Sequence, residues 1–337
     1  MRTFKKISMV KSGGSELSGL MKHCCVALLY SLFAMQLQAQ QKPPALKIAY
    51  NVYEDTAKDN YDIYVMNADG TGKKNITNTS GVEWVYYAFD NRLYYISDKD
   101  TCHRCYFLYE MDAAGNNQRK ITNLQVEDSW MGSRNNGKEM IVAGRIGKQV
   151  RYQLFLVDIK TGAYRQLTND TVSNQSDPLF LPGGKQIVLR YRPEKKLRTT
   201  QPAELWVMGL NGSDKRQLTF FPKSDTTTPW YEYHAGPPQW NNRYKFISYM
   251  SRQNRQTQVY AITLDGKKQW QLTKGAMNTG WHSWSADGNW MIMDRSPRVG
   301  RGFDIYLMHY KTGKEWQLTD AYKSEMAPVF VLPAPEN

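Results

Sequence analysis

Six stretches of the chain share one pattern of apolar and polar positions. In each, an apolar and aromatic stretch is followed by a glycine turn and by a short segment ending in Leu-Thr or Ile-Thr. The apolar stretches are residues 62–66, 107–111, 153–157, 204–208, 258–262 and 304–308. Their alternation with period two predicts β-strands. The repeated threonines lie 45, 46, 51, 54 and 46 residues apart, so the chain is an internal repeat.

Most repeats contain two further strands upstream of this pattern. In the sixth repeat, Asp287 and Gly288 mark a turn, residues 289–293 follow it as a strand, and residues 281–284 precede it as another. Four strands in about 45–50 residues match the size of a propeller blade. No stretch reads as a helix of any length. The sequence therefore predicts an all-β fold, a six-bladed β-propeller of four-stranded blades.

The two ends of the repeat array complement each other. The first repeat begins at residues 46–50 with a second strand, and no first strand precedes it. The C-terminal residues 327–331 match a first strand, so we expect the C-terminal strand to complete the first blade. Such closure leaves no open sheet edge to aggregate. The alternative is an open array of β-repeats.

The repeats resemble those of the TolB-like six-bladed propeller family. The likeness is best seen in Trp284-Ser-Ala-Asp-Gly288, Asp304-Ile-Tyr-Leu-Met308 and Gln317-Leu-Thr319, and it covers roughly residues 46–332. It implies a single propeller domain over residues 40–337. TolB itself carries an α/β domain before its propeller, whereas only residues 40–45 stand there in this chain. Repeats of this kind occur in transport accessories, lyases and peptidase accessory domains, so the fold implies no one function.

The N-terminal residues 1–39 read as a secretory signal. Five basic residues against one acid precede an apolar run from Cys24 to Met35, and a polar stretch begins after Ala39. The alternative is a membrane anchor, but the run is shorter than the ~20 residues that a span needs. Met21 is an alternative start. We expect cleavage near Ala39 and a periplasmic or extracellular protein that does not span a membrane.

Export changes what the charge implies. The full chain carries a formal charge of +13, and removing residues 1–39 leaves +13 − 4 = +9. Nucleic acid is an unlikely partner for an exported protein, which leaves an envelope protein or a glycan. The basic residues cluster between strands of the fourth and sixth blades, in loops that we expect to be solvated or to contact an anionic partner: Arg190, Arg192, Lys195, Lys196 and Arg198, and Arg295, Arg298 and Arg301. We expect a monomer.

Two cysteines, Cys102 and Cys105, remain in the mature chain. In an exported protein, this spacing indicates a small structural disulfide, a redox pair or half of a zinc site. No second pair with the same spacing is present, and the segment is a loop rather than a helix start. The sequence therefore favours a disulfide that closes a short loop and adds modest entropic stability.

Candidate binding residues gather where the innermost strands begin. Aligned by the turn after each first strand, Trp84, Trp130 and Trp281 are equivalent, and Asp177 takes the same place in another blade. The residues near these positions are Glu83, Asp128, His234, His282 and Glu325. Tryptophan faces and carboxylates around one funnel suit a sugar or a peptide. The alternative is that the tryptophans pack between blades and the acids form a solvated rim.

Function divides into two hypotheses. The first is an exported propeller scaffold that binds a protein or glycan in its central funnel. The second is a polysaccharide-active enzyme, a lyase or glycoside hydrolase, in which rim carboxylates or the histidines act in the funnel. The sequence contains no Gly-x-Ser-x-Gly elbow, no His-Glu-x-x-His and no phosphate-binding glycine loop. We therefore expect no cofactor, no metal site and no catalytic residue, and favour the first hypothesis.

Overall fold

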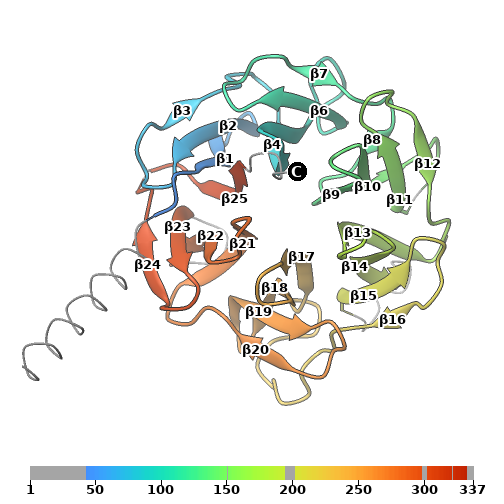
Figure 1. Cartoon of the computed structure of the whole chain (residues 1–337), viewed down its shortest axis with the longest axis vertical. Coiled ribbons are helices and arrows are strands. Elements are labelled where there is room, and N and C mark those ends of the chain that lie inside the picture. Colours follow the sequence, from blue (N-terminus) through green and yellow to red (C-terminus); the bar gives the residue numbers. More distant parts are fainter. Residues whose placement is uncertain (1–42, 150, 194–201, 298–301, 321, 332–337) are drawn as a thin grey trace, which may run out of the picture. The chain divides into compact units, whose positions relative to one another are not determined.

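The computed structural model describes residues 43–149, 151–193, 202–297, 302–320 and 322–331. Within these residues the secondary structure consists of β-strands, without an α-helix. The strands form six antiparallel sheets arranged as blades around a central axis (Figure 1). The predicted all-β, six-bladed propeller is confirmed.

The strands of each blade follow one another from the axis outward. The first blade contains β25 (Glu325–Val331), β1 (Lys47–Asp55), β2 (Asn60–Asn67) and β3 (Lys74–Asn75). The second contains β4 (Glu83–Phe89), β5 (Arg92–Ser97), β6 (Phe107–Asp112) and β7 (Arg119–Lys120). In the third, β8 (Gln125–Val126) and β9 (Gly132–Arg134) share the innermost position, outside which lie β10 (Glu139–Arg145), β11 (Gln153–Asp158) and β12 (Tyr164–Gln166).

The other three blades repeat the same order. The fourth contains β13 (Ser173–Phe180), β14 (Gln186–Pro193), β15 (Glu204–Gly209) and β16 (Arg216–Gln217). The fifth contains β17 (Ala235–Asn241), β18 (Phe246–Gln253), β19 (Gln256–Thr263) and β20 (Gln269–Gln271). The sixth contains β21 (Asn278–Trp284), β22 (Trp290–Ser296), β23 (Asp304–His309) and β24 (Lys314–Gln317).

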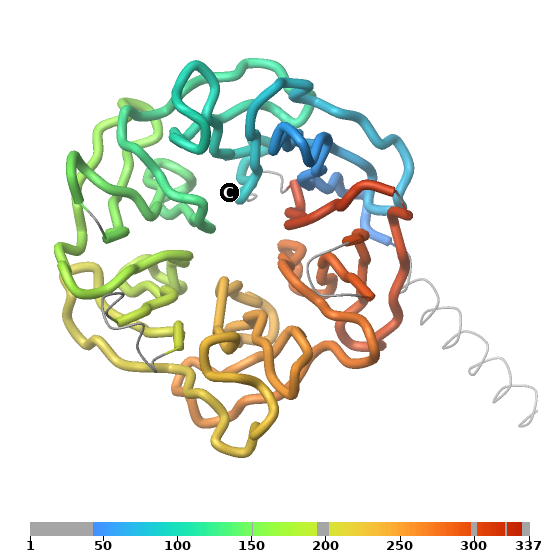
Figure 2. The backbone as a smooth tube through the Cα atoms, turned by 180° about the vertical axis from the view of Figure 1, so that it is seen from behind, coloured from blue at the N-terminus to red at the C-terminus, as the bar shows by residue number. Residues whose placement is uncertain are grey.

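The C-terminal strand closes the ring. β25 pairs antiparallel with β1, with Phe330 opposite Ile48 and Met326 opposite Asn51. Figure 2 shows this segment, in red, beside the blue start of the first blade. The predicted closure is confirmed, because the first blade takes its innermost strand from the far end of the sequence.

The threonine that ends each repeat fastens the outer edge of its blade. In five blades its Oγ1 accepts a hydrogen bond of 2.8–3.0 Å from the backbone N–H of the third-strand residue 14 positions earlier. In three of these blades the hydroxyl also donates to the side chain just before that N–H, which is Asp62 at 2.8 Å, Glu204 at 2.6 Å or Gln258 at 2.6 Å. The hydroxyl thus gives a hydrogen-bond partner to a backbone N–H near the start of the third strand.

The apolar core lies between blades rather than inside any one of them. One cluster joins Ile48, Tyr50 and Met66 of the first blade to Trp290 and Ile292 of the sixth. Comparable clusters join the third blade to the fourth, the fourth to the fifth, and the fifth to the sixth. Each blade thus relies on its neighbours to bury its apolar faces.

Removing the hydroxyl of one repeat-ending threonine, which we call the threonine clamp, tests this architecture. We expect Thr273→Val to lower the free energy of unfolding by about 1–3 kcal/mol, because Val259 N–H loses its partner in a buried site and Gln258 Oε1 keeps only the Thr279 hydroxyl, at 3.3 Å. Urea unfolding followed by tryptophan fluorescence measures the change. Thr56→Val, at an exposed turn, is the control, and equal stability of the two variants would contradict the clamp.

Candidate functional site

The central channel has two distinct ends. At the strand-start face, the innermost strands begin and the second strands lead into the third. At the opposite hairpin face lie the turns between first and second strands. The innermost strands are bent between these faces, since a register shift interrupts their pairing in five blades: β4, β13, β17, β21 and β25. In the third blade, residues 127–131 separate β8 from β9. Bulges of this kind re-aim side chains, here on the channel wall.

Two buried side chains hold bulges of neighbouring blades. Asn51 Oδ1 accepts a hydrogen bond of 2.7 Å from the Val85 N–H of the second blade. Asp294 Oδ2 accepts one of 2.8 Å from the Ala327 N–H of the first blade. Asn51 and Asp294 occupy equivalent second-strand positions, because they face Ile63 and Ile305. Burial is the main reason that the pKa of Asp294 is raised to about 7.

The three predicted tryptophans belong to one aromatic chain. Trp84 packs edge-on against Trp281 with ring centroids 5.8 Å apart, and it also contacts Tyr86 at 6.1 Å. Tyr86 in turn packs edge-on against Trp130 at 5.6 Å. Trp84 and Trp130 are only 8% and 4% exposed, whereas Trp281 is half-buried. Packing between blades thus accounts for the first two rings, and Trp281 keeps a surface for a ligand.

The register changes the predicted equivalence of these tryptophans. Counted back from Ala88, Ser133 and Trp284, which face equivalent second-strand residues, Trp130 and Trp281 share one position. Trp84 lies one residue earlier, and Val85 takes the equivalent place. The alignment by turns was wrong for this blade, because its hairpin turn is two residues shorter: four residues separate Ala88 from its partner Leu93, whereas six separate Trp284 from Met291.

Two predicted acids lie beside this chain and play different parts. Asp177 is buried, accepts a hydrogen bond of 3.0 Å from the Trp130 N–H, and pairs with Arg190 at 3.3 Å. It therefore clamps the neighbouring blade. Asp128 keeps part of its surface exposed to solvent, although its carboxyl lies close to other protein groups. It accepts a hydrogen bond from the Tyr86 hydroxyl. The loss of water around Asp128 raises its pKa, and Asp177 adds like-charge repulsion.

The other two acids are not a solvated rim. Glu83 is buried, and it accepts hydrogen bonds from Ser97 at 3.0 Å and from Thr79. Glu325 is buried at the start of β25. In both cases burial is the largest cause of a raised pKa. Their side chains are engaged in the first and second blades and leave little surface for a ligand.

The structure separates the two histidines by environment. His282 is fully buried, with Nε2 2.7 Å from the Ser248 hydroxyl, and burial lowers its pKa to about 3. It joins the fifth and sixth blades and does not reach solvent. His234 is half-buried and its Nδ1 lies 3.2 Å from the Glu232 carbonyl. Burial and the nearby Arg190 lower the pKa of His234 to about 4, so it is neutral at pH 7.

Arginine–carboxylate pairs occur in five blades, a feature that sequence reasoning missed. Five of the pairs use an arginine near the end of the second strand or in the loop after it: Arg104–Asp59, Arg145–Glu127, Arg190–Asp177, Arg252–Glu232 and Arg295–Glu315. The first four span 2.7–3.3 Å. A basic residue near the end of the second strand, in four of the six repeats, was the signal that could have found them. Ion pairs with a partly exposed arginine add little stability, so the main effect of the pairs of Arg104, Arg145 and Arg190 is to set charge at the strand-start face.

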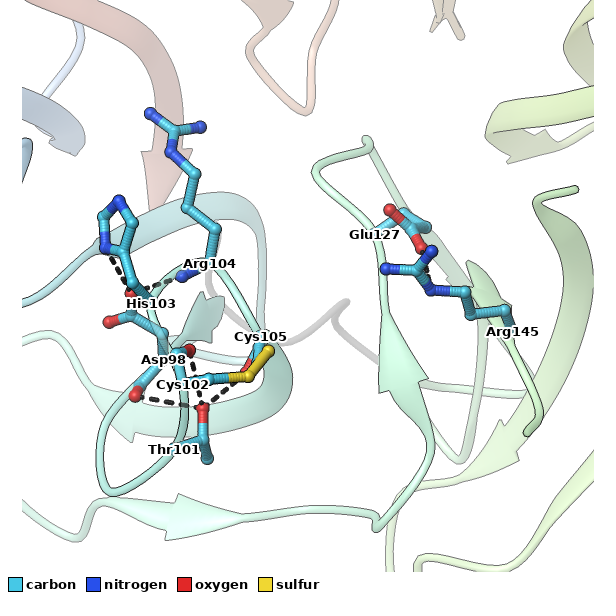
Figure 3. The surroundings of a disulfide bond; sticks show 8 residues. All are labelled: Asp98, Thr101, Cys102, His103, Arg104, Cys105, Glu127 and Arg145. Atoms are coloured by element: carbon cyan, nitrogen blue, oxygen red, sulfur yellow. Dashed lines mark hydrogen bonds and ion pairs between the residues drawn. A yellow bond between two sulfur atoms is a disulfide. The ribbon is translucent and has the colours of Figure 1, made fainter. Parts of the chain in front are cut away.

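The loop between β5 and β6 projects from the strand-start face. The Sγ atoms of Cys102 and Cys105 are bonded in it, and Thr101 Oγ1 donates to the Cys105 carbonyl at 2.7 Å. The Arg104 guanidinium binds Asp59 of the first blade, with its Nε 2.7 Å from the carboxylate. Figure 3 shows this loop and, across from it, the Glu127–Arg145 pair. The loop therefore connects the first two blades beside the channel.

The described residues include only part of the two predicted basic clusters. Arg190 and Arg295 lie within strands β14 and β22 and form ion pairs, so the expectation that they sit in outer solvated loops was wrong. Arg192 is exposed at the end of β14. The remaining members, Lys195, Lys196, Arg198, Arg298 and Arg301, lie outside the described residues.

Comparisons with known proteins bear on this arrangement. The profile of the TolB beta propeller domain matches residues 86–333. The chain belongs to this family. TolB-like propellers solved before share its fold: TolB from Acinetobacter baumannii superposes with a TM-score of 0.65 at 15% identity, covering 88% of this chain and 70% of that one. Putative TolB from Agrobacterium tumefaciens gives 0.60 at 13% identity, covering 84% and 92%.

The TolB-like fold also occurs in an enzyme. Oligogalacturonate lyase from Vibrio parahaemolyticus superposes with a TM-score of 0.51 at 13% identity, covering 77% of this chain and 72% of that one. At such identities the likeness shows the fold alone. No curated protein sequence matches the chain. Among the described residues of this TolB-like propeller, no three His, Cys, Asp or Glu side chains gather as a metal site would require, and no helix is long and apolar enough to cross a membrane.

The buried acid of the sixth blade gives a test by pH. The raised pKa means that Asp294 contributes stability that is fully present below about pH 4 and is lost as pH rises through about 7. Asp294→Asn keeps the acceptor for Ala327 N–H, as Asn51 does for Val85, and does not titrate. We expect the stability of the variant relative to wild type to rise by about 1–3 kcal/mol between pH 4 and pH 8.

Urea unfolding at several pH values measures this difference. Asp100→Asn, at an exposed loop position, is the matched control and should give a constant difference. A constant difference for Asp294→Asn as well would show that the fold does not raise the pKa of this carboxyl.

Proposed function

We propose that this TolB-like chain is an exported binding propeller that takes a segment of an envelope protein at its channel mouth. The channel mouth denotes the exposed or half-exposed groups at the strand-start face: Arg104, Asp128, Arg145, Arg190 and Trp281. The proposal includes export, and the predicted signal, residues 1–39, lies outside the described residues. It agrees with a propeller fold, which presents one open surface on a rigid ring.

The observation that carries the proposal is the composition of this mouth. Trp281 continues a chain of tryptophan and tyrosine rings, and the guanidinium groups of Arg104, Arg145 and Arg190 are each about 35–45% exposed. Tryptophan, tyrosine and arginine are the residues that dominate binding energy in protein interfaces. Each arginine is paired with a carboxylate. Charged groups of a bound protein segment can pair with either member of these ion pairs.

The rigidity of the mouth supports binding without rearrangement. Asp177 and Arg190 fix the bulge that carries Trp130, and Tyr86 holds Asp128 by a hydrogen bond. Pre-ordered side chains reduce the entropy lost when a partner binds. The enzyme hypothesis draws less support, because His282 is buried in a contact with Ser248 and cannot reach a substrate.

Affinity capture from envelope extract tests the proposal. The mature chain is the bait, and Trp281→Ala is the variant that removes the half-exposed ring. We expect a discrete protein partner whose affinity falls at least about tenfold with this variant, since a hot-spot truncation costs about 2 kcal/mol or more. Quantitative mass spectrometry identifies the partner, and titration of the purified pair gives the affinity.

Two further arms make the test specific. Tyr164→Ala, which removes an exposed ring from the outer strand β12, should leave the affinity unchanged. Incubation with polysaccharides, followed by an assay for new chain ends, examines the enzyme hypothesis. Cleavage abolished by Asp128→Asn, or partner binding unaffected by Trp281→Ala, would refute the proposal.

A further inference from the structure

A second concave site lies on the hairpin face, away from the channel mouth. It has a volume of about 440 Å³ and is formed by turns of the second to fifth blades. We call it the hairpin-face groove, and its principal side chains are Tyr87, Phe89, Arg134, Asn135, Phe180, Trp240 and Asn242. Its size falls within the range of small-molecule sites, about 300–1,000 Å³. Aromatic rings and amide side chains thus alternate around one hollow.

Trp240 has an indole N–H without a partner among the described residues, although the nitrogen is buried. The equivalent residue of the sixth blade, Trp284, donates its indole N–H to Ser248 Oγ at 2.8 Å. For Trp240, the corresponding position of the preceding blade is Val188, which has no acceptor. An unpaired buried donor costs free energy. The Trp240 N–H is therefore available to a ligand in the groove that this ring lines.

The groove carries no free charge. Among the described residues that line it, Arg134 is the only one with a charged side chain, and its Nε lies 2.8 Å from the Glu139 carboxylate. The same guanidinium donates to the Gly184 carbonyl at 2.7 Å and lies 5.3 Å from the centre of the Phe180 ring. With its charge neutralised, Arg134 does not select an anion. The groove therefore suits an uncharged ligand with many hydrogen-bonding groups.

The groove also adjoins the channel. Tyr87 and Trp240 line a second cavity of about 170 Å³, whose wall takes residues from all six blades. Two more buried polar groups in that wall, Trp130 Nε1 and Ser283 Oγ, have no partner among the described residues. A ligand in the groove can thus extend toward further donors at the hairpin end of the channel.

We propose that the hairpin-face groove binds an uncharged oligosaccharide. Ring faces such as those of Phe180 and Trp240 stack on the C–H surfaces of sugars, while amides and the free indole N–H bind hydroxyl groups. A peptide fits less well, because the lining offers no exposed strand edge and no unpaired charge to fix its direction. This site does not depend on the channel mouth and would act beside it.

The test uses the mature chain and uncharged tetrasaccharides: maltotetraose, cellotetraose and chitotetraose. Isothermal titration and tryptophan fluorescence measure binding, and thermal unfolding checks each variant. We expect at least one sugar to bind, and Trp240→Phe, which keeps the ring and removes the N–H, to weaken binding about fivefold. Trp316→Phe, on the outer strand β24 and outside the lining of both cavities, should leave the affinity unchanged.

A second variant guards against a loss of fold. Asn242 is exposed, so Asn242→Ala should fold normally and also weaken sugar binding about fivefold. The proposal is overturned if no tetrasaccharide binds at millimolar concentration, if Trp240→Phe and Trp316→Phe have equal effects, or if Asn242→Ala has none. Binding of uncharged tetrapeptides that displaces every bound sugar at lower concentration would also overturn it.

Discussion

The ring depends on the hydrogen bonds that one threonine side chain makes at the end of each repeat. Its hydroxyl satisfies the N–H of a third-strand residue 14 positions earlier in five blades, and so fixes where the outer segment ends and the next blade begins. Without that stop, the connection to the next innermost strand would have no defined start. The apolar clusters between blades and the pairing of β25 with β1 then hold the blades together as a ring.

The channel follows from a second constraint, the bulge in each innermost strand. Because Asn51 and Asp294 each hold a bulge of the next blade, local departures from strand geometry are coupled around the ring. The bulges turn Trp281 and Asp128 toward solvent while Trp84 and Trp130 remain packed. One rigid wall thus presents two different surfaces, a charged mouth at the strand-start face and a neutral groove at the hairpin face.

The sequence predicted the fold closely because its signals are repeated and local. The alternation, the glycine turns and the Leu-Thr or Ile-Thr pair recur six times. The absence of a first strand before residues 46–50 also predicted the closure by the C-terminal strand. The site was harder to predict. A hairpin turn two residues shorter than in the sixth blade shifts Trp84 out of register with Trp281, and the strand pairing that shows this is not readable from the turn residues alone. The burial of His282 depends on Ser248 of another blade, and the ion pair of Arg190 depends on the bulged Asp177, which are contacts between positions far apart in the chain.

The central claim is that a protein partner binds at the channel mouth. Photo-crosslinking in cells tests it most directly, with p-benzoylphenylalanine placed at Trp281 and, as a matched aromatic position on the outer strand β12, at Tyr164. The account predicts one discrete protein adduct from position 281 and none from position 164. Equal adducts from both positions, or none from position 281, would contradict it.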